Sequence, residues 1–95
     1  MAAKKTLKRD KIQVIADILR AIQAKNGRIK PTHIMYKANL SHTMMNEYLA
    51  ELQKNDLIVQ VQTKTSRSYQ LTEKGFEFLS RYKMIGEFLD TFGIN

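Results

Sequence analysis

The middle of the chain, residues 31–58, carries the clearest hydrophobic pattern. Within it, apolar side chains recur at positions i, i+3, i+4 and i+7, the spacing of one face of an α-helix; they are Met45, Tyr48, Leu49 and Leu52. Ser41 precedes this run and can cap the helix, because its hydroxyl accepts a hydrogen bond from a free first-turn N–H. A shorter apolar segment, residues 32–38, lies before the break at Asn39-Leu40. Two helices joined by a tight turn predict a helix-turn-helix.

Residues 8–25 predict an earlier helix. The positions on its apolar face follow helical spacing; they are Ile12, Ile15, Ala16, Leu19, Ile22 and Gln23, with Val14 and Ile18 widening the stripe. Asn26-Gly27 is a suitable C-terminal cap, and Pro31 suits the first turn of the next helix, where its missing N–H is not needed. Between these two helices, Ile29 is expected to make a small strand contact.

After the helix-turn-helix, the pattern changes to the period of a β-strand. Residues 57–63 and 68–71 alternate apolar and polar side chains, which predicts two strands. The turn between them, Lys64 to Arg67, is polar and basic, so the pair is interpreted as a β-hairpin. A hairpin directly after a helix-turn-helix is the layout of a winged helix-turn-helix, with residues 64–67 as the wing. The predicted fold class is α+β, mainly α.

The last segment predicts a long helix. Thr72 can cap it, and the acidic Glu73 is favourable near a helix N-terminus. The helix would run for about 20 residues, or on the order of 30 Å. Its apolar positions repeat in alternating steps of four and three, which is a heptad seam of period 3.5; they are Leu71, Gly75, Phe78, Tyr82, Ile85, Leu89 and Phe92.

This helix carries more apolar surface than so small a domain can cover. Phe76 and Leu79 are expected to pack on the chain's own core. The rest of the seam is expected to form a homodimer interface; it comprises Phe78, Tyr82, Ile85, Leu89 and Phe92. The alternative is a long helix that folds back over one core. Gly75 and Gly86 each weaken the helix by roughly 1 kcal/mol, so either is a candidate for a close approach.

The 95 residues predict one small domain in three parts. These are a flexible basic arm (1–7), the winged helix-turn-helix (8–71) and a C-terminal coiled-coil dimerisation helix (72–95). Because cysteine is absent, disulfides, thiolate metal sites and a cysteine nucleophile are excluded. No apolar run approaches the roughly 18 residues that span a bilayer, and the N-terminus lacks the apolar region of a secretory signal. We expect a cytoplasmic, nucleoid-associated protein.

The net charge of +7 is unevenly distributed. Residues 1–37 hold ten Lys or Arg against two acids, whereas residues 38–95 hold six against seven. An excess of this kind indicates an anionic partner, with nucleic acid the leading candidate. A merely solubilising surface is the first alternative. An anionic membrane is the second, but no basic amphipathic segment remains once the core is built.

The second helix of the helix-turn-helix is the candidate reader of double-stranded DNA. Asn46 can pair with adenine, and Ser41, His42 or Thr43 can contact phosphates or base edges at the N-terminal end. The outer side of this helix comprises Thr43, Asn46, Glu47, Ala50 and Lys54. Since it carries no arginine, we expect modest sequence specificity. The alternative is a helix face that is only solvated.

Basic side chains around this helix are candidate phosphate contacts. Lys64 and Arg67 lie on the wing, and Arg67 would suit a narrow minor groove or its phosphates. Lys30 and Lys37 flank the first helix of the helix-turn-helix. The N-terminal arm would add salt-sensitive, sequence-independent affinity; its cations are Lys4, Lys5, Lys8, Arg9 and Lys11.

Residues for catalysis or metal binding are scarce. His33 and His42 are the only histidines, and a metal site needs more ligands than they offer. His33 is expected to be a partly buried structural residue. The sequence contains no nucleophile–base arrangement, glycine-rich phosphate loop or paired catalytic carboxylates. We expect no enzyme, metal, cofactor or small-molecule substrate.

Three stretches carry a resemblance to a known family. They are IQVIADILRAI, GRIKPTHIMYKANLSHTMMNEYLAELQKNDLI and YQLTEKGFEFLSRY, and together they cover about 80 residues. The chain resembles the small archaeal winged-helix chromatin proteins of Sulfolobus and its relatives. YxLTxKG is shared with many winged-helix regulators, so THIMYKANLS is the more specific part.

The resemblance implies a homodimer joined by an antiparallel coiled coil of C-terminal helices. It also implies double-stranded DNA binding through the second helix and the wing, with bridging or bending of DNA. The terminal helix is short for that family, which affects the separation of the two heads. Two other functions are consistent with the residues: a site-specific viral or plasmid repressor, and a winged-helix protein–protein interaction module.

Overall fold

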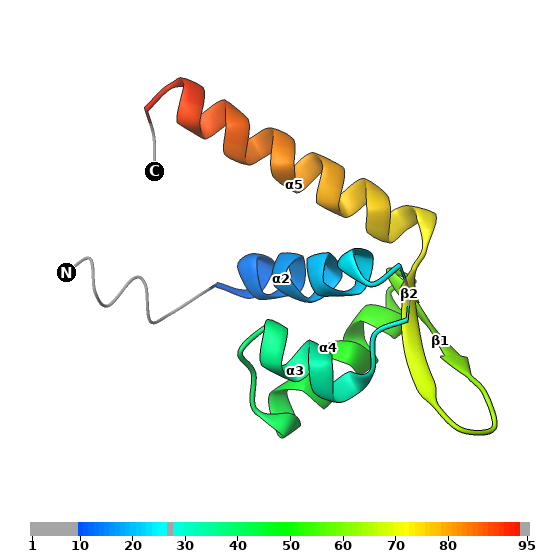
Figure 1. Cartoon of the computed structure of the whole chain (residues 1–95). Helices are drawn as coiled ribbons and strands as arrows, with labels where there is room; N and C mark the ends of the chain where they lie inside the picture. The colour runs from blue at the N-terminus through cyan, green and yellow to red at the C-terminus, as the bar shows by residue number, and fades with distance from the viewer. Residues whose placement is uncertain (1–9, 27, 94–95) are drawn as a thin grey trace.

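The computed structural model describes residues 10–26 and 28–93, so the expected arm over residues 1–7 lies outside them. The described elements are α2 (Lys11–Ala24), α3 (Pro31–Lys37), α4 (His42–Lys54), β1 (Ile58–Gln62), β2 (Arg67–Leu71) and α5 (Glu73–Thr91). The α+β, mainly helical fold class is confirmed. Helices α2, α3 and α4 gather beside the hairpin, and α5 leaves the end of β2 as a long rod above α2 (Figure 1).

Helix α2 is delimited by polar contacts at both ends. The Asp10 carboxylate accepts a hydrogen bond from the Gln13 N–H at 2.9 Å, and the Gln13 side chain accepts one from the Asp10 N–H at 3.1 Å. Because this capping box satisfies first-turn donors, the helix begins at Lys11, later than predicted. At the other end, Asn26 has a left-handed φ of 53°, which ends the helix. Gly27 lies outside the described residues.

The helix-turn-helix forms as predicted, with a proline as the first residue of α3. The turn is closed by the Leu40 N–H, which donates to the Met35 carbonyl at 3.0 Å. Asn39 takes the left-handed φ of 54° that this turn requires. The Ser41 hydroxyl accepts a hydrogen bond from the Met44 N–H at 3.1 Å and so caps α4.

The hairpin is also joined to the link between α2 and α3 by a backbone contact. Strands β1 and β2 pair antiparallel, with Gln62 opposite Arg67 at the turn end. A single bridge between Ile29 and Tyr69 places the α2–α3 link beside β2, which confirms the expected strand contact of Ile29. Both residues are buried. The link that leads into α3 is therefore held at a fixed position relative to the hairpin.

The core lies between α2, α3, α4, the hairpin and the start of α5. Its largest fully buried side chains are Ile18, Leu19, Ile22, Ile29, Ile34, Met45, Leu52 and Ile58. Two members of the predicted α2 stripe are wrong, because Ile12 is 55% exposed and Gln23 is exposed as well. Both lie near the ends of α2, whereas Ala16 and Leu19, on the same side in the middle of the helix, are fully buried. The buried face is centred instead on Ile18 and Ile22.

Helix α5 begins in close contact with the end of α4. Thr72 caps α5 by accepting a hydrogen bond from the Gly75 N–H at 3.0 Å, and its hydroxyl donates to the Asp56 carbonyl at 2.6 Å. The Thr72 N–H donates to the Leu57 carbonyl at 3.1 Å. Gly75 is buried against that same carbonyl. Gly75 therefore marks a close approach, to the backbone that leads into β1.

Alanine at position 75 is expected to be destabilising. Its Cβ would lie 2.3 Å from the Leu57 carbonyl oxygen, a backbone atom that cannot move without shifting β1. Overpacking of this kind lowers the free energy of unfolding by about 1–3 kcal/mol. Gly86→Ala is the matched control: no atom lies within 4 Å of its Cβ position, so it should stabilise the helix, by up to about 1 kcal/mol. Urea unfolding measures both, and a Gly75→Ala protein as stable as wild type would contradict this packing.

The assignment of the α5 side chains needs correction. Leu79 is buried as expected, but Phe76 is 50% exposed. Phe78 and Tyr82, which are expected to meet a second chain, are already half-buried against the chain's own core. Helix α5 runs over α2, and the Arg20 guanidinium lies 5.2 Å from the centre of the Tyr82 ring. The exposed large apolar side chains in the second half of α5 and at its C-cap are Met84, Ile85, Phe88 and Phe92.

Candidate nucleic-acid interface

Helix α4 is positioned by its buried face. Met45, Leu49 and Leu52 are each at most 2% exposed, and Tyr48 is half-buried, as predicted. The opposite side of the helix therefore faces solvent. Its exposed residues include all four predicted DNA contacts, Ser41, His42, Thr43 and Asn46, together with Glu47, Ala50 and Lys54.

Two of these side chains are linked. Asn46 Nδ2 lies 3.2 Å from His42 Nδ1, one helical turn earlier. If the amide donates, the imidazole carries its proton on Nε2. The remaining polar groups of the pair are then the Nε2–H of His42 and the Oδ1 acceptor and second N–H of Asn46. A donor beside an acceptor matches the major-groove edge of adenine, with its N7 acceptor and N6 donor.

The wing has a defined turn. The Thr63 hydroxyl accepts from the Ser66 N–H at 3.1 Å and from the Thr65 N–H at 3.4 Å, and the Thr63 N–H donates to the Ser66 carbonyl at 2.9 Å. Lys64 lies in this turn, whereas Arg67 is already the first residue of β2. These hydroxyl contacts were not anticipated, although a Thr-x-x-Ser sequence at a turn is a recognisable signal for them.

The predicted basic contacts fall on separate elements. Lys30 occupies the N-cap position of α3, without a side-chain capping bond, and Lys37 is the last residue of the helix; both are exposed. Lys30 and Arg67 line one crevice, together with Pro31, Gln62, Thr65 and Ser66. Neither Lys37 nor Lys64 lines it. The structure thus brings two of the four predicted cations together and leaves the other two apart.

The cations of the wing and of α3 differ from several other cations of the chain in their ion pairing. The ion pairs among the described residues are Lys11–Glu51, Arg20–Asp17 and Arg81–Glu77. Lys11, which was assigned to the arm, lies in α2 and donates to Glu51 at 2.7 Å; this hydrogen bond and the charge of Glu51 raise the pKa of the Lys11 ammonium. Within the described part of the chain, the predicted cations of the wing and of α3 form no ion pair, so their charge is available to an anion.

Sequence reasoning missed Tyr36. Its side chain is 74% exposed on α3, beside Lys37, although it was counted in an apolar segment. Ile34 and Ala38 are both fully buried and lie one turn apart, so they define the inward face and leave Tyr36 outside it. That spacing was the available signal. A phenol at this position can donate to a phosphate oxygen.

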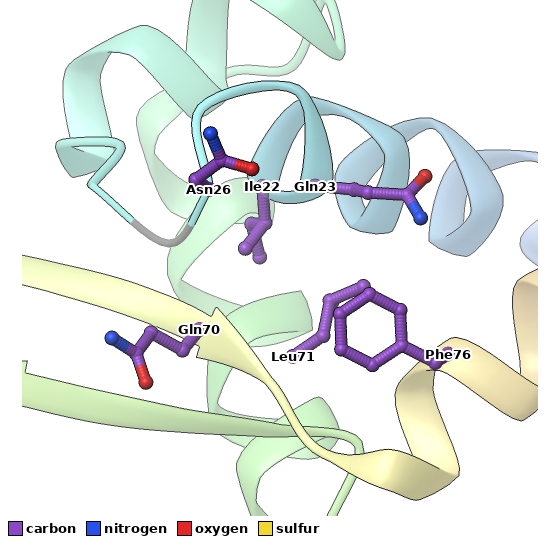
Figure 2. Close-up of a pocket in the computed structure, with 6 residues that line it drawn as sticks. All are labelled: Ile22, Gln23, Asn26, Gln70, Leu71 and Phe76. Atoms are coloured by element: carbon purple, nitrogen blue, oxygen red, sulfur yellow. The ribbon is translucent and has the colours of Figure 1, made fainter.

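Other kinds of site find little support in the described residues. They include no group of three or more His, Cys, Asp or Glu that could hold a metal ion. His33 is exposed on α3, not partly buried, because it precedes the inward-facing Ile34. A cavity of about 320 Å³ lies between α2, β2 and α5, where Ile22, Leu71 and Phe76 point toward one another (Figure 2). Its remaining lining residues are the uncharged amides Gln23, Asn26 and Gln70. No described helix is long and apolar enough to cross a membrane.

The fold and the exposed α4 face agree with one protein family, described as winged helix-turn-helix, which matches residues 8–89. The chain belongs to the winged helix-turn-helix family. The predicted resemblance is confirmed at this level, and the hairpin residues 64–67 are its wing. A relative, the uncharacterized protein MJ0290 of Methanocaldococcus jannaschii, is 39% identical over 80 residues. These are 84% of this chain and 35% of MJ0290, so the chain spans about a third of that relative's length.

Solved structures show the same winged-helix fold. Sso10a-2, a DNA-binding protein from Sulfolobus solfataricus, has a TM-score of 0.75 at 20% identity, with 88% of this chain and 85% of that chain covered. A mutant of MepR from S. aureus, bound to an oligodeoxyribonucleotide, has a TM-score of 0.72 at 13% identity. That match covers 82% of this chain and 59% of MepR. At these identities the likeness concerns the fold.

Proposed function

We propose that this winged-helix protein binds double-stranded DNA without catalysing a reaction. The proposal is supported most directly by the exposed polar side chains in the N-terminal half of α4. Exposed cations at α3 and at the wing add positive charge, and none of them is ion-paired within the described chain. The net charge of +7 supports an anionic partner. Sso10a-2 and MepR, which share the fold, are a DNA-binding protein and a protein bound to DNA.

In this proposal α4 enters the major groove. His42, Thr43 and Asn46 meet base edges, and the Ser41 hydroxyl, which accepts from Met44, still has its proton to donate to a phosphate. Lys30, Lys37, Lys64 and Arg67 contact the backbone on either side. Because α4 carries no arginine, strong guanine readout is not expected and the sequence preference is low to moderate. Such binding suits a nucleoid-associated protein.

Fluorescence anisotropy on random-sequence and AT-rich duplexes, titrated with salt, tests the proposal. We expect binding to both duplexes. The logarithm of the affinity should fall linearly with the logarithm of the salt concentration, with a slope of roughly −0.9 per neutralised phosphate. Strong preference for one operator would instead indicate a site-specific repressor. No binding to any duplex at near-physiological salt would contradict the proposal and favour a protein-interaction module.

The His42–Asn46 pair gives a more specific expectation. Asn46→Ala should remove the donor–acceptor pair and reduce any preference for adenine at one position by about 1–3 kcal/mol, while leaving binding to random duplex nearly unchanged. Asn46→Asp is a useful comparison, because it adds a charge that should weaken binding to every sequence. Bound-sequence selection with each variant measures this, and an unaltered preference in Asn46→Ala would remove Asn46 from the reading surface.

We also propose that two copies associate through α5. Met84, Ile85, Phe88 and Phe92 are each about 60% exposed and lie on one side of the helix. The Phe88 and Phe92 rings are 4.7 Å apart and form one continuous apolar surface. Compared with the interface predicted from sequence, Ile85, Leu89 and Phe92 are retained, Met84 and Phe88 are added, and Phe78 and Tyr82 contribute less because they serve the chain's own core.

A further inference from the structure

A crevice of about 360 Å³ lies between the wing and the start of α3. One wall is Lys30 and Pro31, and the other comprises Gln62, Thr65, Ser66 and Arg67. The two cations come from segments that are distant in the sequence. Sequence reasoning treated them separately, with Lys30 on a phosphate and Arg67 suited to a minor groove. In the structure they share one lining.

Both walls are fixed by contacts within the protein. Ile29, immediately before Lys30, is fully buried and bridges to Tyr69 of β2, two residues after Arg67. The opposite wall is set by the Thr63 hydroxyl, which accepts hydrogen bonds from the Thr65 and Ser66 N–H groups. The backbone segments that carry the two cations therefore do not need to be brought together when a ligand binds, which reduces the entropic cost of binding.

The chemistry of the lining favours a tetrahedral oxyanion. A lysine and an arginine supply two positive charges, and Thr65, Ser66 and Gln62 supply neutral hydrogen-bond donors. No Asp or Glu is among the described residues that line the crevice. Across the described ranges, neither cation has a carboxylate partner. A phosphate group with its adjoining sugar is the ligand that fits such a lining on a DNA-binding surface.

We propose that Lys30 and Arg67 bind the same phosphate of the DNA backbone, so that the base of the wing follows the backbone and Arg67 does not enter the minor groove. This inference rests on the proposed DNA binding. In it, Lys30 and Arg67 contact one phosphate together, whereas two independent cations would contact two phosphates. Lys64, in the turn and outside the crevice, is left to contact DNA independently.

The salt dependence of binding to a random duplex tests the sharing, with Lys30→Ala, Arg67→Ala and the double variant compared with wild type. Each single variant should change the log–log slope by well under about 0.9, because the remaining cation still neutralises the phosphate; the double variant should change it by about 0.9. Lys37→Ala with Lys64→Ala is the matched control for two cations outside the crevice, with an expected change of about 1.8. Thermal unfolding verifies that the variants fold, as expected for exposed side chains.

Three results would overturn the inference. The first is a double variant whose slope falls by about 1.8, with each single variant losing about 0.9, which means that the two cations contact separate phosphates. The second is a double variant whose slope is unchanged. The third is an Arg67→Ala protein that loses affinity selectively for AT-rich duplexes, which would locate Arg67 in the minor groove. Failure of the proposed function is distinguishable, because the unmodified protein would then not bind duplex DNA.

Discussion

Phe88→Asp is expected to give a folded protein that no longer dimerises. Phe88 is 60% exposed in the single chain and contacts Phe92, so the substitution removes no core contact. Burying a carboxylate in the proposed α5 interface, without a partner, should weaken association by roughly 2–4 kcal/mol, or about 30- to 1,000-fold. Because each dimer contains the change twice, we expect a monomer at all practical concentrations. Light scattering after size exclusion measures this directly.

Lys83→Asp is the matched control for the dimer. Lys83 is exposed on the same helix, roughly 140° from Phe88 around its axis. The Lys83→Asp protein should therefore stay dimeric, although it also gains a carboxylate.

The monomeric Phe88→Asp protein should bind short duplexes more weakly than wild type, because a dimer offers two linked DNA-binding surfaces. A Phe88→Asp protein that remains dimeric would exclude this face of α5 from the interface.

Ile18→Ala is expected to cause the largest loss of stability. Ile18 is fully buried where α2 meets the rest of the core, and truncation leaves a cavity that the surroundings only partly fill. Substitutions of this type cost about 2–5 kcal/mol, a large part of the roughly 5–15 kcal/mol that holds a small domain together. Thermal or urea unfolding gives the value.

Ile12→Ala is the matched control for Ile18→Ala. It makes the same chemical change on the same helix, but at a side chain that is 55% exposed. We expect a change of less than about 1 kcal/mol, since little surface is lost and alanine has the better helix propensity. Equal losses for the two variants would show that the burial pattern of α2 is wrong.

The same two isoleucines illustrate how far the sequence determines the structure. The period of the apolar residues predicted that α2 is a helix, but Ile12 and Ile18 both fit a broad stripe. Which of them is buried depends on how α3, β2 and α5 surround α2. Local signals were more reliable: the Ser41 and Thr72 caps, the tight turn at Asn39 and the strand contact of Ile29 all form as predicted.

The α5 seam and the wing crevice could not be predicted for a similar reason. Phe78 and Tyr82 fit a heptad repeat, and nothing local indicates that Arg20, far away in the sequence, lies over the Tyr82 ring. Likewise, Lys30 and Arg67 were each recognisable as exposed cations. Their shared crevice depends on the Ile29–Tyr69 bridge and on the turn set by Thr63, which are tertiary and turn contacts.

Backbone amide NMR shifts during titration with a random duplex would show whether the α4 face and the wing bind duplex DNA. We expect the largest shifts along one continuous surface that includes His42, Asn46, Lys37 and the wing, with little change in the second half of α5. Shifts that are absent at near-physiological salt, or that are confined to α5, would contradict DNA binding by α4 and the wing.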